Sequence, residues 1–273
     1  MPVKQKAGSA TGMKKSILFL ILAAILAFAA VAESSVDKNA SGIELTEINM
    51  SGHPDWWPFM EKNGSAIEGI GPDVAVAVFE PFNTTVNCNY VGNWEQSLNL
   101  GKIGTIDGLV AAYKTREREK YFNYTIPYAS DPVVLFFQNQ TVLVYRDTND
   151  LFGKRIVAMV GDSYGQELDD LLVQTANISL VRVDNPKSAF AMLENDSADY
   201  FIYSYWAGQR VIARENLEGF DNSTVVAEEL FYMAISKKSP WASRMDEINA
   251  SLEKLIQVGA VDEMIKATNT KLA

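Results

Sequence analysis

The chain has 273 residues, of which 48% are hydrophobic, and a net charge of -10 at pH 7. This length suits two lobes of ordinary size, and the acidic balance argues against a nucleic-acid partner because phosphate binding requires a basic surface. A single cysteine and a single histidine cannot build a zinc or iron–sulfur site, and they exclude a disulfide within the chain. We therefore expect no metal and no cofactor.

The first 32 residues have the features of an export signal. Lys14 and Lys15 precede a short apolar run, which ends in Ala-Val-Ala before Glu33. A positive flank, an apolar core and small residues at its exit are typical of secretory signals, and a membrane span usually needs about 20 apolar residues. Residues 1–32 are therefore predicted to be a signal peptide, with an uncleaved anchor as the alternative. The polar residues 33–42 read as a flexible tether.

Asparagine glycosylation signals are a second indication of export. The pattern Asn-x-Ser/Thr occurs far more often than chance would produce in a chain of this composition. It begins at Asn39, Asn49, Asn63, Asn83, Asn123, Asn139, Asn177, Asn195, Asn222 and Asn249. We expect an extracellular or cell-surface glycoprotein.

From about Ile43 onward, short β-rich runs alternate with helical patterns. In chain order, the sequence predicts helices at 71–82 and 93–102, strands at 105–112, 133–137 and 142–146, a strand–turn–helix at 155–176, a strand at 179–183, a helix at 186–196, a strand at 198–206 and two helices within 246–267. Strands that alternate with helices of this length indicate an α/β fold with largely parallel sheets.

A dense cluster of charges follows one of the predicted strands. The segment "KTREREKYFNYTIPY", residues 114–128, places Arg118 three residues after Thr115. Ligands of α/β sheets bind beyond the carboxyl ends of the strands, and a guanidinium grips a carboxylate with two parallel hydrogen bonds. Arg118 is therefore a candidate for binding an anion. The alternative is a surface arginine paired with Glu117 or Glu119.

The turn "GDSYG", residues 161–165, is a second loop suited to an anion. It lies between a predicted strand and a predicted helix, where unpaired N–H groups and the helix dipole attract negative charge, and Ser163 adds a hydroxyl donor. Alone, the turn also fits an ordinary helix cap. Together with Arg118, it predicts a carboxylate held between two α/β halves.

Aromatic side chains also gather at strand ends and in the neighbouring loops. Trp56 lies in the loop "HPDWWPF". The others are Tyr113, Tyr164, Tyr203, Tyr205 and Trp206. One aromatic residue at such a place usually belongs to the core, but several together form flat walls for a ligand or stack against a cation.

Six landmarks follow one another along the chain: "WWPF…GIGPDVA", "WEQSLNLGK…IDGLVAA", "TREREKYFNYTIPY", "LFGKRIVAMVGDSYGQE", "AFAMLENDSADYFIYS" and "FYMAISKKSP". In this order they resemble the family 3 extracellular solute-binding proteins, the receptors of polar amino-acid ABC transporters. The resemblance implies an α/β, two-lobed type II periplasmic-binding-protein (Venus-flytrap) fold with two hinge crossings. Lobe 1 would hold residues 43–136 and 230–273, and lobe 2 would hold residues 137–229.

The resemblance also implies which residues bind the ligand. Arg118, in the "T-x-x-R" motif, would grip an α-carboxylate, and Ser163 would assist from lobe 2. Trp56 would stack on the ligand, while Ala112 and Tyr113 would line the side of lobe 1.

One position departs from the family pattern. Ser204 stands where the family usually has an aspartate that pairs the α-ammonium of the ligand. A serine supplies no negative charge. Either another acid serves, with Asp162 and Asp55 as candidates, or aromatic faces such as that of Tyr164 replace it, or the ligand lacks a free α-amine.

The expected function is capture of a small carboxylate-bearing solute, an amino acid or an analogue, by a monomer that docks on the membrane permease of an ABC importer. We therefore expect the protein to be a receptor and not an enzyme. Two alternatives share the fold: a hydro-lyase of the cyclohexadienyl dehydratase type, with Glu167 and Asp162 available for proton transfer, and an extracellular sensor module. Resemblance of fold does not separate the three.

Overall fold

The structure, a computed structural model, describes residues 45–139, 145–174 and 177–269. The predicted signal peptide, the predicted tether and residues 142–144 of one predicted strand lie outside this range. From Leu45 on, the chain clusters as one compact unit. Within the described residues, no helix combines the length and the apolar character that crossing a membrane requires.

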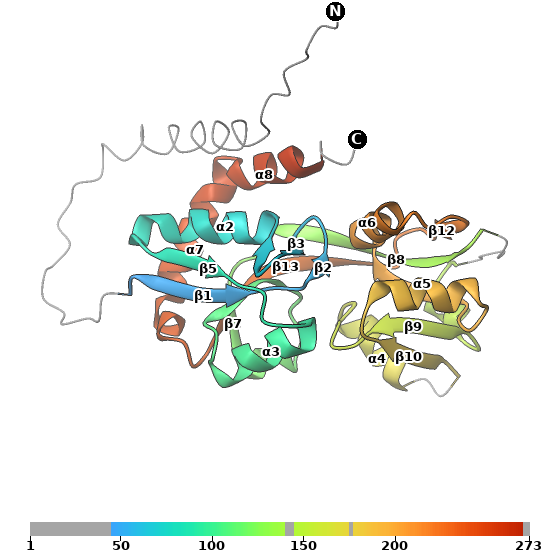
Figure 1. The fold of residues 1–273 in the computed structure, drawn as a ribbon. Helices are drawn as coiled ribbons and strands as arrows, with labels where there is room; N and C mark the ends of the chain where they lie inside the picture. Colours follow the sequence, from blue (N-terminus) through green and yellow to red (C-terminus); the bar gives the residue numbers. More distant parts are fainter. Residues whose placement is uncertain (1–44, 140–144, 175–176, 270–273) are drawn as a thin grey trace, which may run out of the picture. The chain divides into compact units, whose positions relative to one another are not determined.

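A mixed ten-stranded sheet runs through this unit in the order β10-β9-β11-β8-β13-β6-β1-β5, with β12 beside β8 and β7 beside β13 (Figure 1). The strands are β1 (Glu47–Ser51), β5 (Thr85–Cys88), β6 (Gly108–Ala112), β7 (Phe122–Tyr124), β8 (Ala129–Gln138), β9 (Arg155–Met159), β10 (Ser179–Val183), β11 (Tyr200–Ser204), β12 (Phe220–Asn222) and β13 (Ala227–Ser236). A small antiparallel sheet is formed by β2 (Asp55–Trp56), β3 (Met60–Asn63) and β4 (Ala66–Glu68).

Helices cover the sheet in two separate groups. Around β1, β5 and β6 lie α2 (Ile70–Phe79), α3 (Trp94–Ile103), α7 (Met245–Gln257) and α8 (Ala260–Asn269), with α7 and α8 packed on α2. Around β9 to β11 lie α4 (Gln166–Gln174), α5 (Pro186–Glu194) and α6 (Tyr205–Glu215). Short 3-10 helices are η2 (Glu80–Phe82), η3 (Arg118–Lys120), η4 (Thr148–Leu151) and η5 (Pro240–Arg244). We call the first group, with its strands, lobe 1 and the second group lobe 2.

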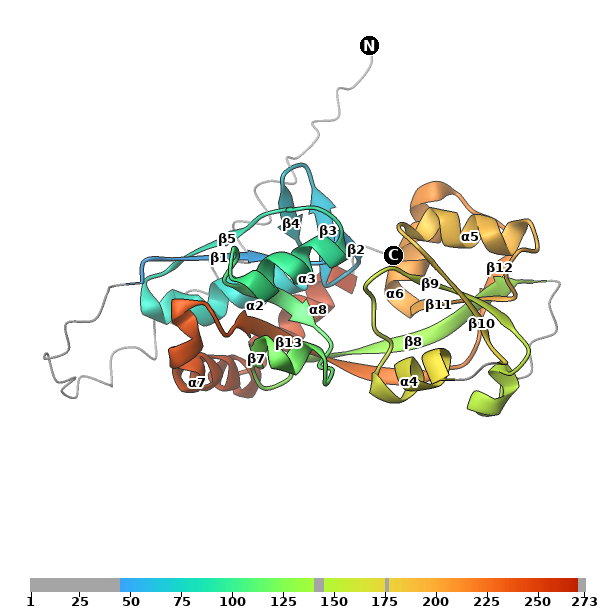
Figure 2. The ribbon, with the colours of Figure 1, turned by 90° about the horizontal axis from the view of Figure 1, so that it is seen from below.

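Two long strands, β8 and β13, connect the lobes. They pair antiparallel from Ala227 opposite Val133 to Phe231 opposite Ala129, and Figure 2 shows them running side by side between the two groups of helices. Towards lobe 1, β13 pairs with β6 and β7, and towards lobe 2, β8 pairs with β11 and β12. The chain thus passes between the lobes twice. The predicted lobe boundaries at residues 136 and 230 fall inside these strands and stay a prediction.

Most predicted elements coincide with observed ones, with three differences. In the strand predicted at 142–146, the two described residues, Tyr145 and Arg146, are not in a strand. The pairs β1–β5, β1–β6, β9–β10 and β9–β11 are parallel as expected, but every pair made by β8 or β13 is antiparallel because these strands are the connections themselves. The strand predicted at 198–206 ends at Ser204, whose Oγ accepts the N–H of Ala207 at 3.4 Å. This cap starts α6 at Tyr205, so Tyr205 and Trp206 are helical.

Gly208 of α6 allows the helix to lie directly on β8. A Cβ atom added at this position would lie 2.2 Å from two ring carbons of Phe136, a ring that is itself fully buried. We expect Gly208→Ala to destabilise the fold by about 1–3 kcal/mol because the ring cannot move without disturbing its neighbours. Urea unfolding measures this, with Ala213→Ser on the exposed face of α6 as the control, for which we expect a change of about 0.5 kcal/mol or less.

Candidate functional site

A small cavity lies where the lobes meet, at the carboxyl ends of β1 and β6. It is lined by His53, Trp56, Met60, Trp94, Ala111, Ala112, Tyr113, Arg118, Ser163 and Phe231. Five of the residues predicted from the sequence meet here: Arg118, Ser163, Trp56, Tyr113 and Ala112. The cavity measures about 20 Å³, enough for one water molecule, whereas pockets for small ligands commonly measure about 300–1,000 Å³. A ligand can therefore enter only if the lobes separate.

Arg118 is buried between the lobes. Its Nη1 donates to the carbonyl oxygen of Tyr113 in lobe 1 and its Nη2 donates to that of Gly161 in lobe 2, both at 3.0 Å. The guanidinium carbon lies 5.4 Å from the ring centroid of Trp94. Burial lowers the pKa of Arg118, and only 6% of the residue is exposed. The cation is thus removed from water while its two best-placed donors bind only carbonyl groups.

The alternative of a surface arginine is wrong. Lys120 pairs with Glu117 at 2.5 Å, and Lys114 pairs with Glu119 at 2.9 Å, so the neighbouring acids bind other cations. Thr115 fixes the start of the turn, because its Oγ1 accepts the backbone N–H of Arg118 at 3.2 Å. The turn directs the guanidinium inward and leaves the other charges of the segment at the surface.

The predicted anion-binding turn before α4 is occupied by an acid of the chain itself. The hydroxyl of Ser163 donates to Asp169, and the N–H of Tyr164 donates to Oδ1 of Asp169 at 2.9 Å. Burial raises the pKa of Asp169. The turn approaches α3 closely at Gly161, where φ is +79° and an added Cβ would lie 3.2 Å from Cβ of Glu95. A ligand anion at Ser163 would have to compete with Asp169.

His53, the single histidine of the chain, contributes to the site, although no sequence motif pointed to it. It follows β1, is buried, and places Nε2 3.2 Å from Oδ1 of Asp162. Its Nδ1 accepts the N–H of Asp55 at 2.9 Å, so the proton is on Nε2, which donates to Asp162. Oδ2 of Asp162 is buried and has no hydrogen-bond partner among the described residues. This pair joins the lobes beside the cavity.

Asp131 of β8 is a residue that sequence reasoning missed. It is fully buried and accepts hydrogen bonds from Nε1 of Trp56 at 2.7 Å, from the hydroxyl of Tyr113 at 2.5 Å and from Oγ of Ser204 at 2.8 Å. Burial raises the pKa of Asp131 to about 6, against the opposing effect of the three donors. Three residues predicted separately therefore converge on one carboxylate. The signal in the sequence that could have identified Asp131 was an acidic residue within the apolar run "SDPVVLFF".

Tyr164 does not line the cavity. It is fully buried inside lobe 2, where its hydroxyl oxygen accepts the N–H of Met159 at 2.9 Å. Tyr203 of β11 reaches across to lobe 1 and donates to the carbonyl oxygen of Asp55 at 2.5 Å. Ser204 and Asp162 also lie outside the cavity lining. Asp162 binds the lining residue His53 directly, whereas Ser204 is connected to Trp56 and Tyr113 through Asp131.

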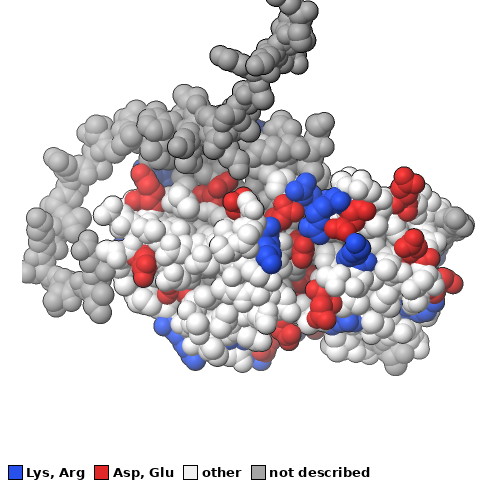
Figure 3. Space-filling model, in the orientation of Figure 1, with Lys and Arg blue, Asp and Glu red and all other residues white. Residues whose placement is uncertain are grey.

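Ion pairs join α6 to the small sheet at the surface of the same junction. Arg210 pairs with Glu61 at 3.1 Å and lies 4.9 Å above the ring of Trp57, and Arg214 pairs with Asp55 at 3.4 Å. Figure 3 shows the basic and acidic side chains gathered there. Surface pairs contribute about 0.2–1 kcal/mol each, so they favour the closed arrangement without fixing it.

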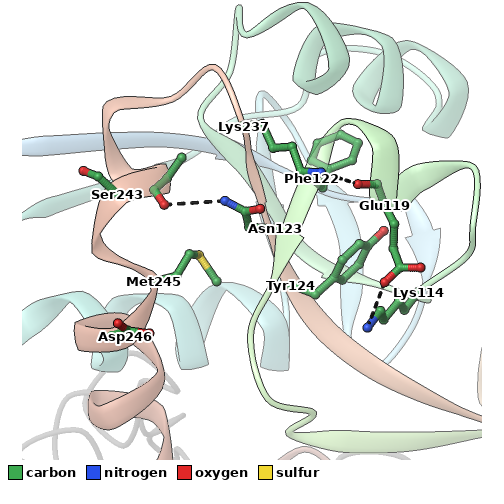
Figure 4. A pocket seen from close by; sticks show the side chains of 10 residues that line it. Lys114, Glu119, Phe122, Asn123, Tyr124, Lys237, Ser243, Met245 and Asp246 are labelled. Carbon is green, nitrogen blue, oxygen red and sulfur yellow. Dashed lines mark hydrogen bonds and ion pairs between the residues drawn. The ribbon is translucent and has the colours of Figure 1, made fainter.

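A larger groove of about 520 Å³ lies in lobe 1, between β7 and η5 (Figure 4). Its basic groups are engaged: Lys237 donates to the carbonyl oxygen of Glu119 at 2.6 Å, and Lys114 pairs with the carboxylate of Glu119. Asn123 donates to the carbonyl oxygen of Ala242 at 3.5 Å. The groove holds none of the predicted ligand-binding residues. The cavity between the lobes therefore remains the candidate site despite its small volume.

Solved structures show the same fold at low sequence identity. A mutant of ArgBP from T. maritima is 19% identical with a TM-score of 0.68, and the match covers 82% of this chain and 95% of that chain. A histidine kinase sensor domain with similarity to periplasmic binding proteins is 18% identical with a TM-score of 0.71, at 82% and 96% coverage. The arginine-, lysine-, histidine-binding protein ArtJ from Geobacillus stearothermophilus is 17% identical with a TM-score of 0.67, at 81% and 94% coverage.

These likenesses define a two-lobed α/β fold of the type II periplasmic-binding-protein class. The family of bacterial extracellular solute-binding proteins, family 3, matches residues 48–268, and the chain belongs to this family. No curated protein sequence matches the chain significantly.

The raised pKa of Asp131 predicts a specific pH dependence of stability. Because the folded pKa of about 6 lies above the unfolded value of 3.8, the stability that the bound proton provides is complete below pH 3.8 and is lost as the pH rises through 6. The ionised carboxylate then costs the fold up to about 3 kcal/mol at neutral pH. Asp131→Asn carries no such charge, so its stability relative to the parent should increase by about 2–3 kcal/mol between about pH 4 and pH 7.

Urea titrations of both proteins at a series of pH values measure this difference. Asp221→Asn, at an exposed position of β12, is the control and should give a nearly constant difference. A constant difference for Asp131→Asn would mean that Asp131 titrates normally.

Proposed function

We propose that this protein captures a small carboxylate-bearing solute, an amino acid or an analogue, between its lobes and presents it to the membrane permease of an ABC importer. The supporting observation is the buried guanidinium of Arg118, which reaches both lobes and, within the part of the chain that the structure describes, forms hydrogen bonds only to carbonyl groups. A planar fork of this kind matches a carboxylate with two parallel, charge-assisted hydrogen bonds. Family membership supports a binding role.

Capture requires the lobes to open and close. Separation would break the contact between Nη2 of Arg118 and Gly161, and the pair between His53 and Asp162, and so free these groups for a solute. On closure, the solute would contact Arg118 from lobe 1 and Ser163 from lobe 2 at once. Its binding free energy then shifts the equilibrium of the hinge, because these contacts coexist only in the closed form.

The class of solute rests on the site and on the neighbours together. The similar structures include an arginine-binding protein and an arginine-, lysine-, histidine-binding protein, which suggests an amino acid here. Trp56, Tyr113 and Trp94 would cover the apolar part of the solute, since all three line the cavity. A monomer would suffice, because one chain supplies both walls.

Two other functions each have an observation in their favour. The similar histidine kinase sensor domain favours signalling, in which the closed form acts on a receptor and not on a permease. The hydrogen bond between His53 and Asp162 favours a hydro-lyase, because it places a histidine and a carboxylate beside the cavity. Product formation from prephenate or arogenate would reveal the enzyme. Transport or sensing depends on which membrane partner binds the closed form.

Arg118→Lys tests the carboxylate grip. A lysine keeps the charge but cannot form two parallel hydrogen bonds, so we expect at least about a tenfold loss of affinity for the best solute of a panel of amino acids and dicarboxylates. Thermal shift finds the solute, since ligand binding raises the melting temperature, and calorimetric titration gives its affinity. Arg116→Lys is the matched control, because Arg116 is exposed two positions earlier. Unchanged affinity in Arg118→Lys would contradict the proposal.

Export and glycosylation remain part of the proposal, and the surface shows where sugars could attach. Among the described sites, the exposed asparagines are Asn63, Asn83, Asn139, Asn177 and Asn195. Asn249 accepts the N–H of Ile126 at 2.8 Å and lies partly buried. We expect glycopeptides at the exposed positions in mass spectra of the protein purified from its own source. Unmodified peptides at all five would contradict glycosylation.

A further inference from the structure

The two sides of the cleft differ in how their charges are balanced. Among the described residues, Arg118 is the cation that lines the cavity, and the charges of Asp162 and Asp169 both act on it. Asp131 has only neutral hydrogen-bond donors and forms no ion pair with a described cation. A buried carboxylate without a cationic partner is costly, and the cost falls when a cation binds beside it.

The donors of Asp131 come from both lobes. Asp131 and Ser204 lie on neighbouring strands, since β8 pairs with β11 on the side of lobe 2. Trp56 and Tyr113 belong to lobe 1, and both bind Oδ2 of Asp131 while lining the cavity. Opening of the lobes would draw these two donors away from Oδ2. The carboxylate would then face the cleft in which the solute binds.

Asp131 also has room for another donor. A carboxylate oxygen accepts two hydrogen bonds, and Oδ1 accepts only the one from Ser204 among the described residues. The hydroxyl of Ser204 can rotate to accept a hydrogen bond from an incoming group, so the serine and the carboxylate together suit an ammonium. Asp162 is the other acid that could bind the cationic group, but its Oδ1 already accepts a hydrogen bond from Nε2 of His53 and its charge interacts with that of Arg118.

We propose that Asp131 pairs with the cationic group of the solute, so that the cleft selects molecules that carry both a carboxylate and an ammonium or guanidinium group. This inference rests on the proposed function, and it assigns the specificity to β8. Arg118 and Asp131 then act on opposite charges of the same molecule. Trp56 and Tyr113, which contact the cavity and Asp131 together, form the wall between the two subsites.

The test uses matched pairs of carboxylates that differ in the amine. The full chain is screened by thermal shift against glutamate and hydroxyglutarate, phenylalanine and phenyllactate, leucine and hydroxyisocaproate, and aminocaproate and caproate. We expect the amine-bearing member of at least one pair to raise the melting temperature while its amine-free partner does not. Equal shifts by both members of the responding pairs would overturn the inference and leave the proposed function standing.

Variants then locate the acid responsible. For the responding amine, we expect Asp131→Asn to bind about 10- to 100-fold more weakly, because a charge-assisted bond becomes a neutral one. Asp162→Asn is the matched control and should retain the preference for the amine. A preference lost in Asp162→Asn and kept in Asp131→Asn would overturn the assignment. If Asp131→Asn does not fold, Asp131→Glu replaces it: the charge is kept but displaced by one methylene, and unaltered affinity would count against the inference.

These experiments distinguish a failure of the proposed function from a failure of the role assigned to Asp131. If Arg118→Lys abolishes binding while Asp131→Asn binds amines as well as the parent, the carboxylate site stands and the cation site is wrong. If no member of any pair and no member of the panel of amino acids and dicarboxylates, arginine included, raises the melting temperature of the parent, the proposed function fails and this inference fails with it.

Discussion

The site depends on a buried guanidinium whose hydrogen bonds, among the described residues, go to carbonyl groups and not to a carboxylate. Nη1 and Nη2 of Arg118 bind one carbonyl oxygen from each lobe, and the face of Trp94 covers the rest of the group. Carbonyl groups compensate the lost hydration only in part, because they carry no net charge. In the closed arrangement the burial of this cation is therefore only partly compensated. Binding of an anion to the guanidinium would offset the remaining desolvation free energy. The other contacts between the lobes surround this group and have to break before a solute reaches it.

A second set of contacts places negative charge around the same cleft. Asp131 binds the two aromatic residues that line the cavity, and Asp162 binds His53. The bond between Asp162 and His53 connects the two lobes, and the bonds of Asp131 connect lobe 1 to the connecting strand β8, so all three depend on how the lobes are arranged. The side chains that would bind the solute are thus the same ones that form these contacts in the closed arrangement. This arrangement suits a solute-binding protein of the proposed kind, in which a partner would have to distinguish a loaded form from an empty one.

The sequence predicted the fold well because local patterns dominate it. The helix signals around Pro186 and Gly259 matched observed boundaries, whereas α3 continues through Gly101 to Ile103. The position of Arg118 after a strand end made it a candidate but left a surface arginine as the alternative. What the sequence could not give were contacts between distant segments. The hydrogen bond from Trp56 to Asp131 spans 75 positions and that from His53 to Asp162 spans 109, and no spacing rule connects residues so far apart. Asp169 likewise competes for Ser163 through a turn geometry that the motif alone does not reveal.

The volume of the cavity has a kinetic consequence. Since about 20 Å³ cannot admit a solute, binding must wait for the lobes to part, and the observed association rate should level off at high solute concentration at the rate of opening. Only a fraction of the empty molecules is open at any moment, and this fraction limits how fast a solute is captured. The ion pairs of Arg210 and Arg214 at the junction belong to the closed form, so raising the ionic strength would screen them and enlarge that fraction. Salt would then speed the capture of a solute, the reverse of what simple charge attraction predicts.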